Sequence, residues 1–131
     1  MIAELLIAYT INSNVPDTDG IEKAVTYIQA QAKQHDLAFP MPNRRIAFMI
    51  NPEGVPRGFM GFNTLAYAAT NLDPCLIVFV DPQSATRQSV IRHEILHCLG
   101  VPHSDYKLDL MFTTSRNQEF SKRELIRWKR K

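Results

Sequence analysis

Short apolar runs separated by turn-forming residues dominate the pattern of this chain and predict a small sheet. The runs at 5–11, 45–50 and 75–80 are each followed directly by Asn or Asp, as buried strands often are. The run at 75–80 is rich in β-branched residues and too short for a core helix, so we expect a central strand there. The stretch 58–71 mixes aromatic residues with glycines and predicts an irregular edge strand followed by a loop.

Two longer segments have the spacing of amphipathic or buried helices. Apolar residues recur every three or four positions behind a polar start at Asp17 and Thr18, which predicts a helix ending near Asp36. A second helix is expected over 84–99, where Gly100 provides the usual C-terminal stop.

The C-terminal segment predicts a third helix and completes the order of elements. Ser121 and Glu124 have the spacing of a capping box, with Leu125 and Trp128 on one helix face. The order strand, helix, strands, helix, loop, helix indicates an α+β fold or a mixed three-layer domain. Neither repeats nor linkers interrupt residues 1–131, so we expect a single domain.

Composition narrows the classes of function. Of the 131 residues, 45% are hydrophobic and 21% are charged, which is ordinary for a folded globular protein. The net charge of +2 is too small to indicate a nucleic-acid partner, and the basic residues near the C-terminus are interpreted as a solvated helix face. No apolar run approaches the length of a membrane span, and the first residues lack the features of a secretory signal. We therefore expect a soluble monomer with no membrane partner and no export address.

The two cysteines, Cys75 and Cys98, permit at most one internal bridge. A chain with so few cysteines lacks the density of a disulfide framework. We therefore predict two buried free thiols.

The segment from residue 93 to 103 carries the strongest chemical signal. Residues four apart on a helix differ by about 40° of rotation, so His93 and His97 lie on one face, one turn apart. Gly100 permits a sharp turn after the helix, which lets His103 approach the same point. Three neutral imidazoles with one open position form a typical catalytic zinc site, and Glu94 beside them is the expected general base for the water on the metal.

This segment resembles the metzincin metallopeptidases, whose pattern H-E-x-x-H-x-x-G-x-x-H it matches at every fixed position. It is most similar to the matrixins, because Ser104 follows the third histidine and Leu-Met-Phe at 110–112 stands where that group has Leu-Met-Tyr. The resemblance implies a zincin-like catalytic domain with a twisted mixed sheet, an active-site helix and a C-terminal helix. It also implies that Met111 is the Met-turn residue beneath the metal.

The resemblance extends to an expected substrate-binding strand. Residues Leu65, Ala66, Tyr67 and Ala68 are similar to a matrixin edge strand along which the substrate peptide lies antiparallel. Tyr67 replaces the histidine that holds a structural zinc in matrixins, and no cluster of His or Asp precedes the helix that carries His93. We therefore expect one catalytic Zn²⁺ and neither a second zinc nor calcium sites.

The sequence thus predicts a zinc-dependent endopeptidase that acts on polypeptides, with Glu94 taking a proton from water. Two alternatives stay open. In the first, the metal only stabilises a non-catalytic binding module, although structural zinc sites use four protein ligands. In the second alternative, the protein is a zinc amidase that acts on a non-protein amide.

Overall fold

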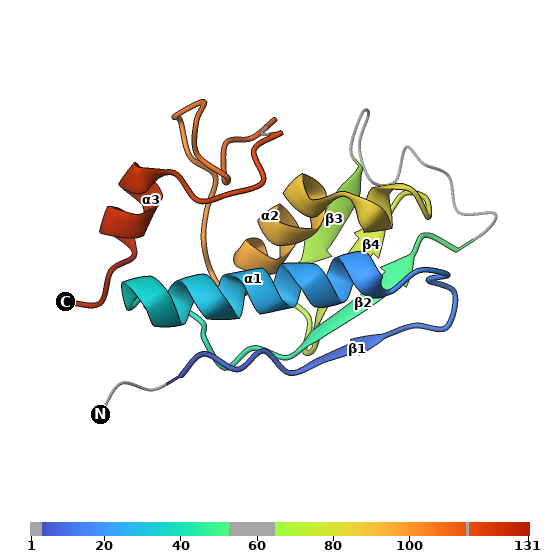
Figure 1. Cartoon of the computed structure of the whole chain (residues 1–131). Coiled ribbons are helices and arrows are strands. Elements are labelled where there is room, and N and C mark those ends of the chain that lie inside the picture. Colours follow the sequence, from blue (N-terminus) through green and yellow to red (C-terminus); the bar gives the residue numbers. More distant parts are fainter. Residues whose placement is uncertain (1–3, 53–64, 115) are drawn as a thin grey trace.

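The computed structural model describes residues 4–52, 65–114 and 116–131 (Figure 1). In chain order its elements are β1 (Tyr9–Ile11), α1 (Asp19–His35), β2 (Ile46–Ile50), β3 (Ala66–Ala69), β4 (Cys75–Phe79), a 3-10 helix η2 (Ser84–Thr86), α2 (Gln88–Cys98) and α3 (Lys122–Arg127). The fold is α+β, as the order of apolar patterns predicts.

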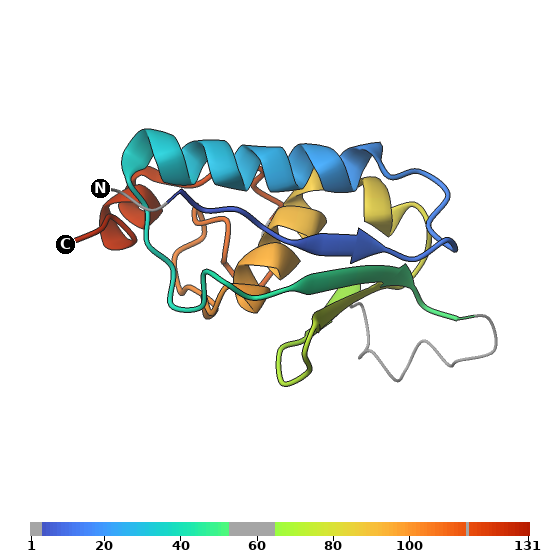
Figure 2. The same ribbon diagram turned by 90° about the horizontal axis from the view of Figure 1, so that it is seen from below.

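The four strands form one mixed sheet in the order β1-β2-β4-β3. Strands β1, β2 and β4 are mutually parallel, and β3 is an antiparallel edge strand paired with β4. Alternate residues of β2 and β4 are fully or nearly fully buried, and the residues between them are half-buried. Helices α1 and α2 pack against the buried face (Figures 1 and 2), so the described residues form two layers rather than three.

The strands confirm the main pattern and correct its edges. β4 is internal, as predicted for 75–80. Within the predicted strand 5–11 only Tyr9–Ile11 pairs with a neighbour, although Leu5 and Ile7 are buried against the core. The predicted edge strand within 58–71 is β3, while residues 58–64 of that prediction lie outside the described residues.

Helix α1 confirms the predicted amphipathic helix and its polar start. Its buried face carries Ile21, Ala24, Val25, Ile28 and Ala32. Thr18 makes no side-chain cap, and the carboxylate of Asp17 instead accepts a hydrogen bond from the Asp19 amide at 3.0 Å. Of the two polar residues predicted at the start of this helix, Asp17 therefore provides the side-chain acceptor and Thr18 does not.

The predicted helix over 84–99 is divided in two. Arg87 has an extended backbone (φ −86°, ψ 115°), which separates η2 from α2. The carboxylate of Asp81 accepts hydrogen bonds from the amide and hydroxyl of Ser84, at 2.8 and 2.9 Å. This local side-chain bonding stabilises a separate short turn, and α2 therefore begins only at Gln88.

The prediction of two free thiols is wrong. Cys75, the first residue of β4, forms a disulfide with Cys98, the last residue of α2, and both are fully buried. The buried face of β4 meets the C-terminal end of α2, which places the two Cα atoms 5.8 Å apart. The disulfide therefore ties the end of α2 to the middle of the sheet.

Helix α3 confirms the predicted capping box. The Ser121 hydroxyl accepts from the Glu124 amide at 3.1 Å, and the Glu124 carboxylate accepts from the Ser121 amide at 3.0 Å. The chain then returns to the end of α1, where the Ala38 amide donates to the Trp128 carbonyl (Figure 1).

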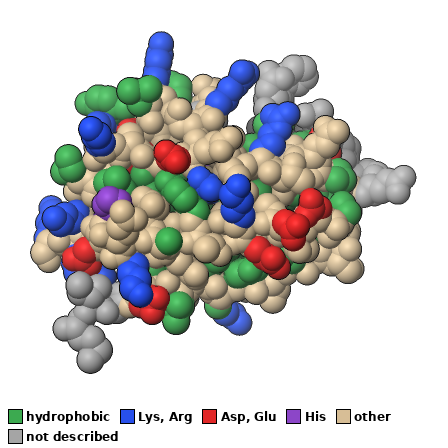
Figure 3. All heavy atoms as spheres, in the orientation of Figure 1, with side chains coloured by type: hydrophobic (Ala, Val, Ile, Leu, Met, Phe, Trp, Pro, Cys, Tyr) green, Lys and Arg blue, Asp and Glu red, His purple; other side chains and the backbone are tan. Residues whose placement is uncertain are grey.

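On the face shown in Figure 3, basic and acidic side chains are interspersed, without a single continuous basic patch. In the part of the chain that the structure describes, no helix has the length and apolar character needed to cross a membrane.

Candidate metal centre

Helix α2 and the turn that follows it position three histidines. His93 and His97 lie one turn apart on the same face of α2. Gly100 has a φ of +90°, and a Cβ added to it would lie 2.9 Å from Pro40, so only glycine fits this turn. The Gly100 amide donates to the His97 carbonyl, which begins the reversal that brings His103 back to α2.

The three imidazoles converge on one point. The Nε2 atom of His97 lies 3.1 Å from Nε2 of His93 and 3.1 Å from Nε2 of His103. Ligand nitrogens around a tetrahedral zinc lie about 3.3–3.4 Å apart, given bond lengths of about 2.0–2.1 Å. All ligand atoms of the group lie within 4.8 Å of one another, so the three histidines can bind one metal ion.

Backbone carbonyls fix which nitrogen of each helix histidine faces the metal position. Nδ1 of His93 lies 3.0 Å from the Leu110 carbonyl, and Nδ1 of His97 lies 2.9 Å from the Val101 carbonyl. A carbonyl only accepts hydrogen bonds, so each Nδ1 carries the proton and each Nε2 keeps its lone pair for a metal. The residues present therefore fit a divalent metal.

The electrostatics of the site favour neutral imidazoles. Burial, followed by the neighbouring rings of His93 and His103, lowers the pKa of His97 to about 4. Burial also lowers the pKa of His93, against the opposite effect of its hydrogen bond to Leu110. Both helix histidines are thus neutral at pH 7, the form that binds a metal.

Glu94 lies beside this group without belonging to it. Its side chain lines the same cleft as the histidines, but it is not among the ligand atoms that converge. Among the described residues, the Glu94 carboxylate has neither a hydrogen-bond partner nor an ion pair. Burial raises the pKa of Glu94 to about 8. This carboxyl group is therefore free to exchange a proton in the cleft.

A buried turn at Leu110 and Met111 supports the histidines from behind. Met111 is 1% exposed, and the neighbouring Leu110 provides the carbonyl that contacts His93. The Ser104 amide donates to the Met111 carbonyl at 2.9 Å, which ties the turn to the residue after His103. The predicted location of Met111 directly beneath the metal remains a prediction.

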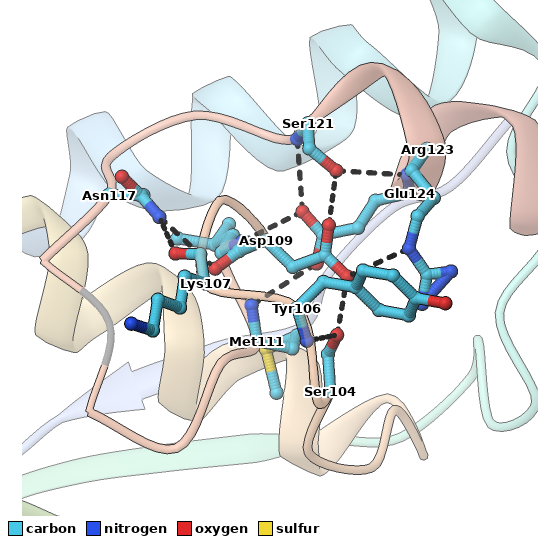
Figure 4. Close-up of polar contacts among 10 residues, drawn as sticks. Ser104, Tyr106, Lys107, Asp109, Met111, Asn117, Ser121, Arg123 and Glu124 are labelled. Atoms are coloured by element: carbon cyan, nitrogen blue, oxygen red, sulfur yellow. Dashed lines mark hydrogen bonds and ion pairs between the residues drawn. The ribbon is translucent and has the colours of Figure 1, made fainter.

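Behind that turn lies a group of polar side chains that we call the carboxylate cluster: the buried Asp109, Glu124 and Ser104 and the half-buried Ser121 (Figure 4). Glu124 accepts hydrogen bonds from the amides of Leu110 and Met111, at 2.7 and 3.1 Å, in addition to the Ser121 amide of the capping box. One carboxylate therefore fixes both the start of α3 and the turn behind His93.

Asp109 fixes the other end of the loop. Its two carboxylate oxygens accept from the hydroxyls of Ser104 and Ser121, and Arg123 lies 3.6 Å away as an ion-pair partner (Figure 4). Because Ser104 follows His103 directly, Asp109 anchors the chain beside the third histidine. No sequence pattern indicated this role, because Asp109 lies in a loop without periodicity.

The metal position opens onto a cleft of about 1060 Å³ beside the edge strand β3. The predicted substrate-binding residues Leu65, Ala66, Tyr67 and Ala68 all line this cleft with the three histidines and Glu94. In the described chain, the outer edge of β3 pairs with no other strand. The structure thus brings every predicted site residue except Met111 to one surface.

Other cleft residues were not predicted from the sequence. Arg87, Ser89 and Val90 come from the start of α2, while Thr113, Thr114 and Arg116 come from the segment after the Met111 turn. Ser89 and Val90 precede His93 by four and three residues, so the helix spacing alone could have placed both on the face that carries His93.

No family model, curated protein or solved structure matches this chain. What the centre can do chemically therefore depends on the residues that form it.

Proposed function

We propose that this protein is a zinc-dependent endopeptidase of the metzincin type. The convergence of three histidine Nε2 atoms at a cleft, next to a carboxyl group without a protein partner, carries this proposal. The motif that supplies these residues resembles the metzincin pattern, and the mixed sheet with its antiparallel edge strand is compatible with it.

A zinc ion held by His93, His97 and His103 would polarise a substrate carbonyl and make water acidic enough to react near neutral pH. Glu94 takes the proton from the attacking water and then donates it to the nitrogen that leaves when the peptide bond breaks. Burial raises the pKa of the Glu94 carboxyl group in the metal-free protein, and the positive charge of a bound zinc ion would oppose this shift and favour the ionised form that accepts the proton.

The cleft residues bind and orient the substrate. The free edge of β3 offers backbone donors and acceptors to an extended peptide, which adds to the sheet as an antiparallel strand. Such pairing recognises the peptide backbone and tolerates many side chains. The reactive bond then lies between β3 and the histidine face of α2.

The exposed position of His103 and the open cleft favour catalysis over a purely structural metal site. In the described residues, no fourth His, Cys, Asp or Glu joins the three histidines. A structural zinc site normally has four protein ligands, which would leave no position for water.

The decisive experiment compares Glu94→Ala with the unaltered protein after loading with zinc. We expect metal content and fold to persist while hydrolysis of a fluorogenic peptide library falls by about 10²- to 10⁴-fold. Glu22→Ala, at an exposed position of α1, is the matched control. Tight zinc binding without cleavage of any peptide by the unaltered protein would overturn the proposal. Release of ammonia or amine from non-peptide amides would then favour an amidase. If neither is released, a binding module is favoured.

A further inference from the structure

Two arginines line the cleft without partners of their own. Arg87 precedes α2 and Arg116 follows the turn at Met111, and both side chains are exposed. Among the described residues, neither guanidinium group has an ion pair, a hydrogen bond or a stacked aromatic ring. Arg92 and Arg123, whose guanidinium groups stack on Tyr27 and Tyr106, are not among the residues that line the cleft.

The charges around the cleft are unbalanced. Glu94 is the single carboxyl group among the described lining residues, and the proposed function assigns it to the chemistry. The hydroxyl groups of Ser89, Thr113 and Thr114 add hydrogen-bond donors to the same surface. Two arginines surrounded by donors match an anionic side chain, because a guanidinium group binds a carboxylate through paired N–H donors.

The direction of the elements places Arg87 relative to the substrate. Strand β2 is parallel to β4, and β3 is antiparallel to β4. In Figures 1 and 2, β2 runs opposite to α2, so β3 and α2 run in the same general direction. A peptide bound antiparallel to β3 runs against α2, and its residues after the scissile bond lie toward Arg87.

The distance along α2 limits which substrate residues Arg87 reaches. Arg87 precedes His93 by six residues, or about 9 Å of helix. An extended peptide advances about 3.3 Å per residue, so this span corresponds to about three residues.

We propose that the cleft selects polypeptides with an aspartate or glutamate within three residues after the scissile bond, through Arg87 and Arg116. This inference rests on the proposed endopeptidase function. The carboxylate of the selected substrate residue acts as the ion-pair partner that neither arginine has within the described chain.

The test uses the full chain loaded with zinc and peptides that differ at one position. Glutamate is compared with glutamine at each of the three positions after the cleaved bond, because the two side chains have the same shape. We expect kcat/KM to favour glutamate by about 2- to 5-fold at one or more positions, as for exposed charge pairs, and the preference to decrease with added salt.

Variants assign the preference to the two arginines. Arg87→Gln and Arg116→Gln should each reduce the ratio of glutamate to glutamine, and the double variant should abolish it. Arg87→Glu should reverse it at the position that Arg87 contacts. Arg127→Gln, at an exposed position of α3, is the control and should leave the ratio unchanged.

Failure of this inference is distinct from failure of the proposed function. Cleavage of both peptides with equal kcat/KM, or a preference that survives in the double variant, would overturn the role of the arginines and leave the peptidase function intact. If the unaltered protein cleaves no peptide, the proposed function and this inference both fall.

Discussion

Two polar clusters lie on opposite sides of the turn at Leu110 and Met111, and they are built in opposite ways. In the histidine cluster, the Nε2 atoms of three side chains face one another at the cleft. In the carboxylate cluster, the oxygens of Asp109 and Glu124 accept hydrogen bonds from neighbouring amides and hydroxyls (Figure 4).

The difference separates groups that stabilise the fold from groups that await a ligand. Buried polar groups normally have hydrogen-bond partners within the protein, and the carboxylate cluster follows this rule. In the histidine cluster, only the Nδ1 atoms of His93 and His97 contact backbone carbonyls. The two clusters meet at Leu110, whose amide donates to Glu124 and whose carbonyl contacts His93. The carboxylate cluster therefore holds the histidine cluster in place.

The largest effect should come from removing one of the three proposed metal ligands. His103→Ala deletes an exposed side chain whose described contacts are with the other histidines, so zinc affinity should fall more than 100-fold, beyond the 10- to 100-fold typical of residues behind the ligands. The free energy of unfolding of the metal-free protein should change by less than about 1 kcal/mol. Chelator competition and urea unfolding measure the two quantities. A large loss of metal-free stability would make His103 a structural residue and weaken the contrast between the clusters.

The next largest effect should come from the carboxylate cluster. Here the main loss should be in the free energy of unfolding of the metal-free protein rather than in zinc affinity. Glu124→Ala leaves the amides of Leu110, Met111 and Ser121 without their acceptor, so the free energy of unfolding should fall by about 3–5 kcal/mol. Glu124→Gln keeps one acceptor oxygen and should lose less. Urea unfolding of the metal-free protein gives both values, and the exposed Glu119→Ala serves as the control.

A second measurement on Glu124→Gln tests the connection between the clusters. Because Leu110 joins Glu124 to His93, zinc affinity should fall by about 10- to 100-fold even though the variant folds. Unchanged zinc affinity would show that the turn supports the histidines without help from α3.

Removal of the disulfide, which anchors α2 one residue after His97, should cause a comparable loss of stability. The bridge spans 23 residues, and the loop-closure entropy predicts a loss of about 3 kcal/mol for Cys75→Ala with Cys98→Ala. Intact-mass analysis of the unreduced, denatured protein should show no alkylated cysteine. Two adducts would restore the free thiols expected from the sequence. A disulfide of this kind is typical of proteins that fold in oxidising compartments.

The sequence predicted the histidine cluster because its geometry is local. A helix fixes the relation of His93 to His97, and the positive φ of Gly100 was predictable from the need to turn toward His103. The carboxylate cluster was missed because the capping box gave Glu124 a sufficient role near Ser121. Its further bonds to the Met111 turn depend on how α3 packs, which no local pattern encodes.

Long-range pairing explains the remaining differences between sequence and structure. The disulfide requires the end of α2 to meet the start of β4, a contact set by the whole sheet rather than by the spacing of Cys75 and Cys98. Hydrophobic runs identified β2 and β4, but they do not encode strand order. The division of the predicted helix at Arg87 likewise depends on side-chain bonds from Asp81.

The smallest predicted effect concerns Glu94 in the protein freed of metal with a chelator. Burial raises the pKa of Glu94 to about 8 from 4.5, so between these values the folded protein retains a proton that the unfolded chain releases. The contribution of Glu94 to stability therefore decreases as pH rises from 4.5 to 8. Glu94→Gln removes this dependence, while the opposite effect of His97, which raises stability between pH 4 and 6.5, is common to both proteins.

The metal-free Glu94→Gln variant should accordingly match the unaltered protein below pH 4.5 and be more stable above it, with the difference levelling off above pH 8. We expect about 1–2 kcal/mol, since Glu94 is partly exposed and solvent screens its charge. Urea unfolding at a series of pH values measures the difference. A variant that is less stable at pH 8 would mean that the ionised Glu94 has a partner in the folded protein. The contrast between the two clusters would then not hold at Glu94.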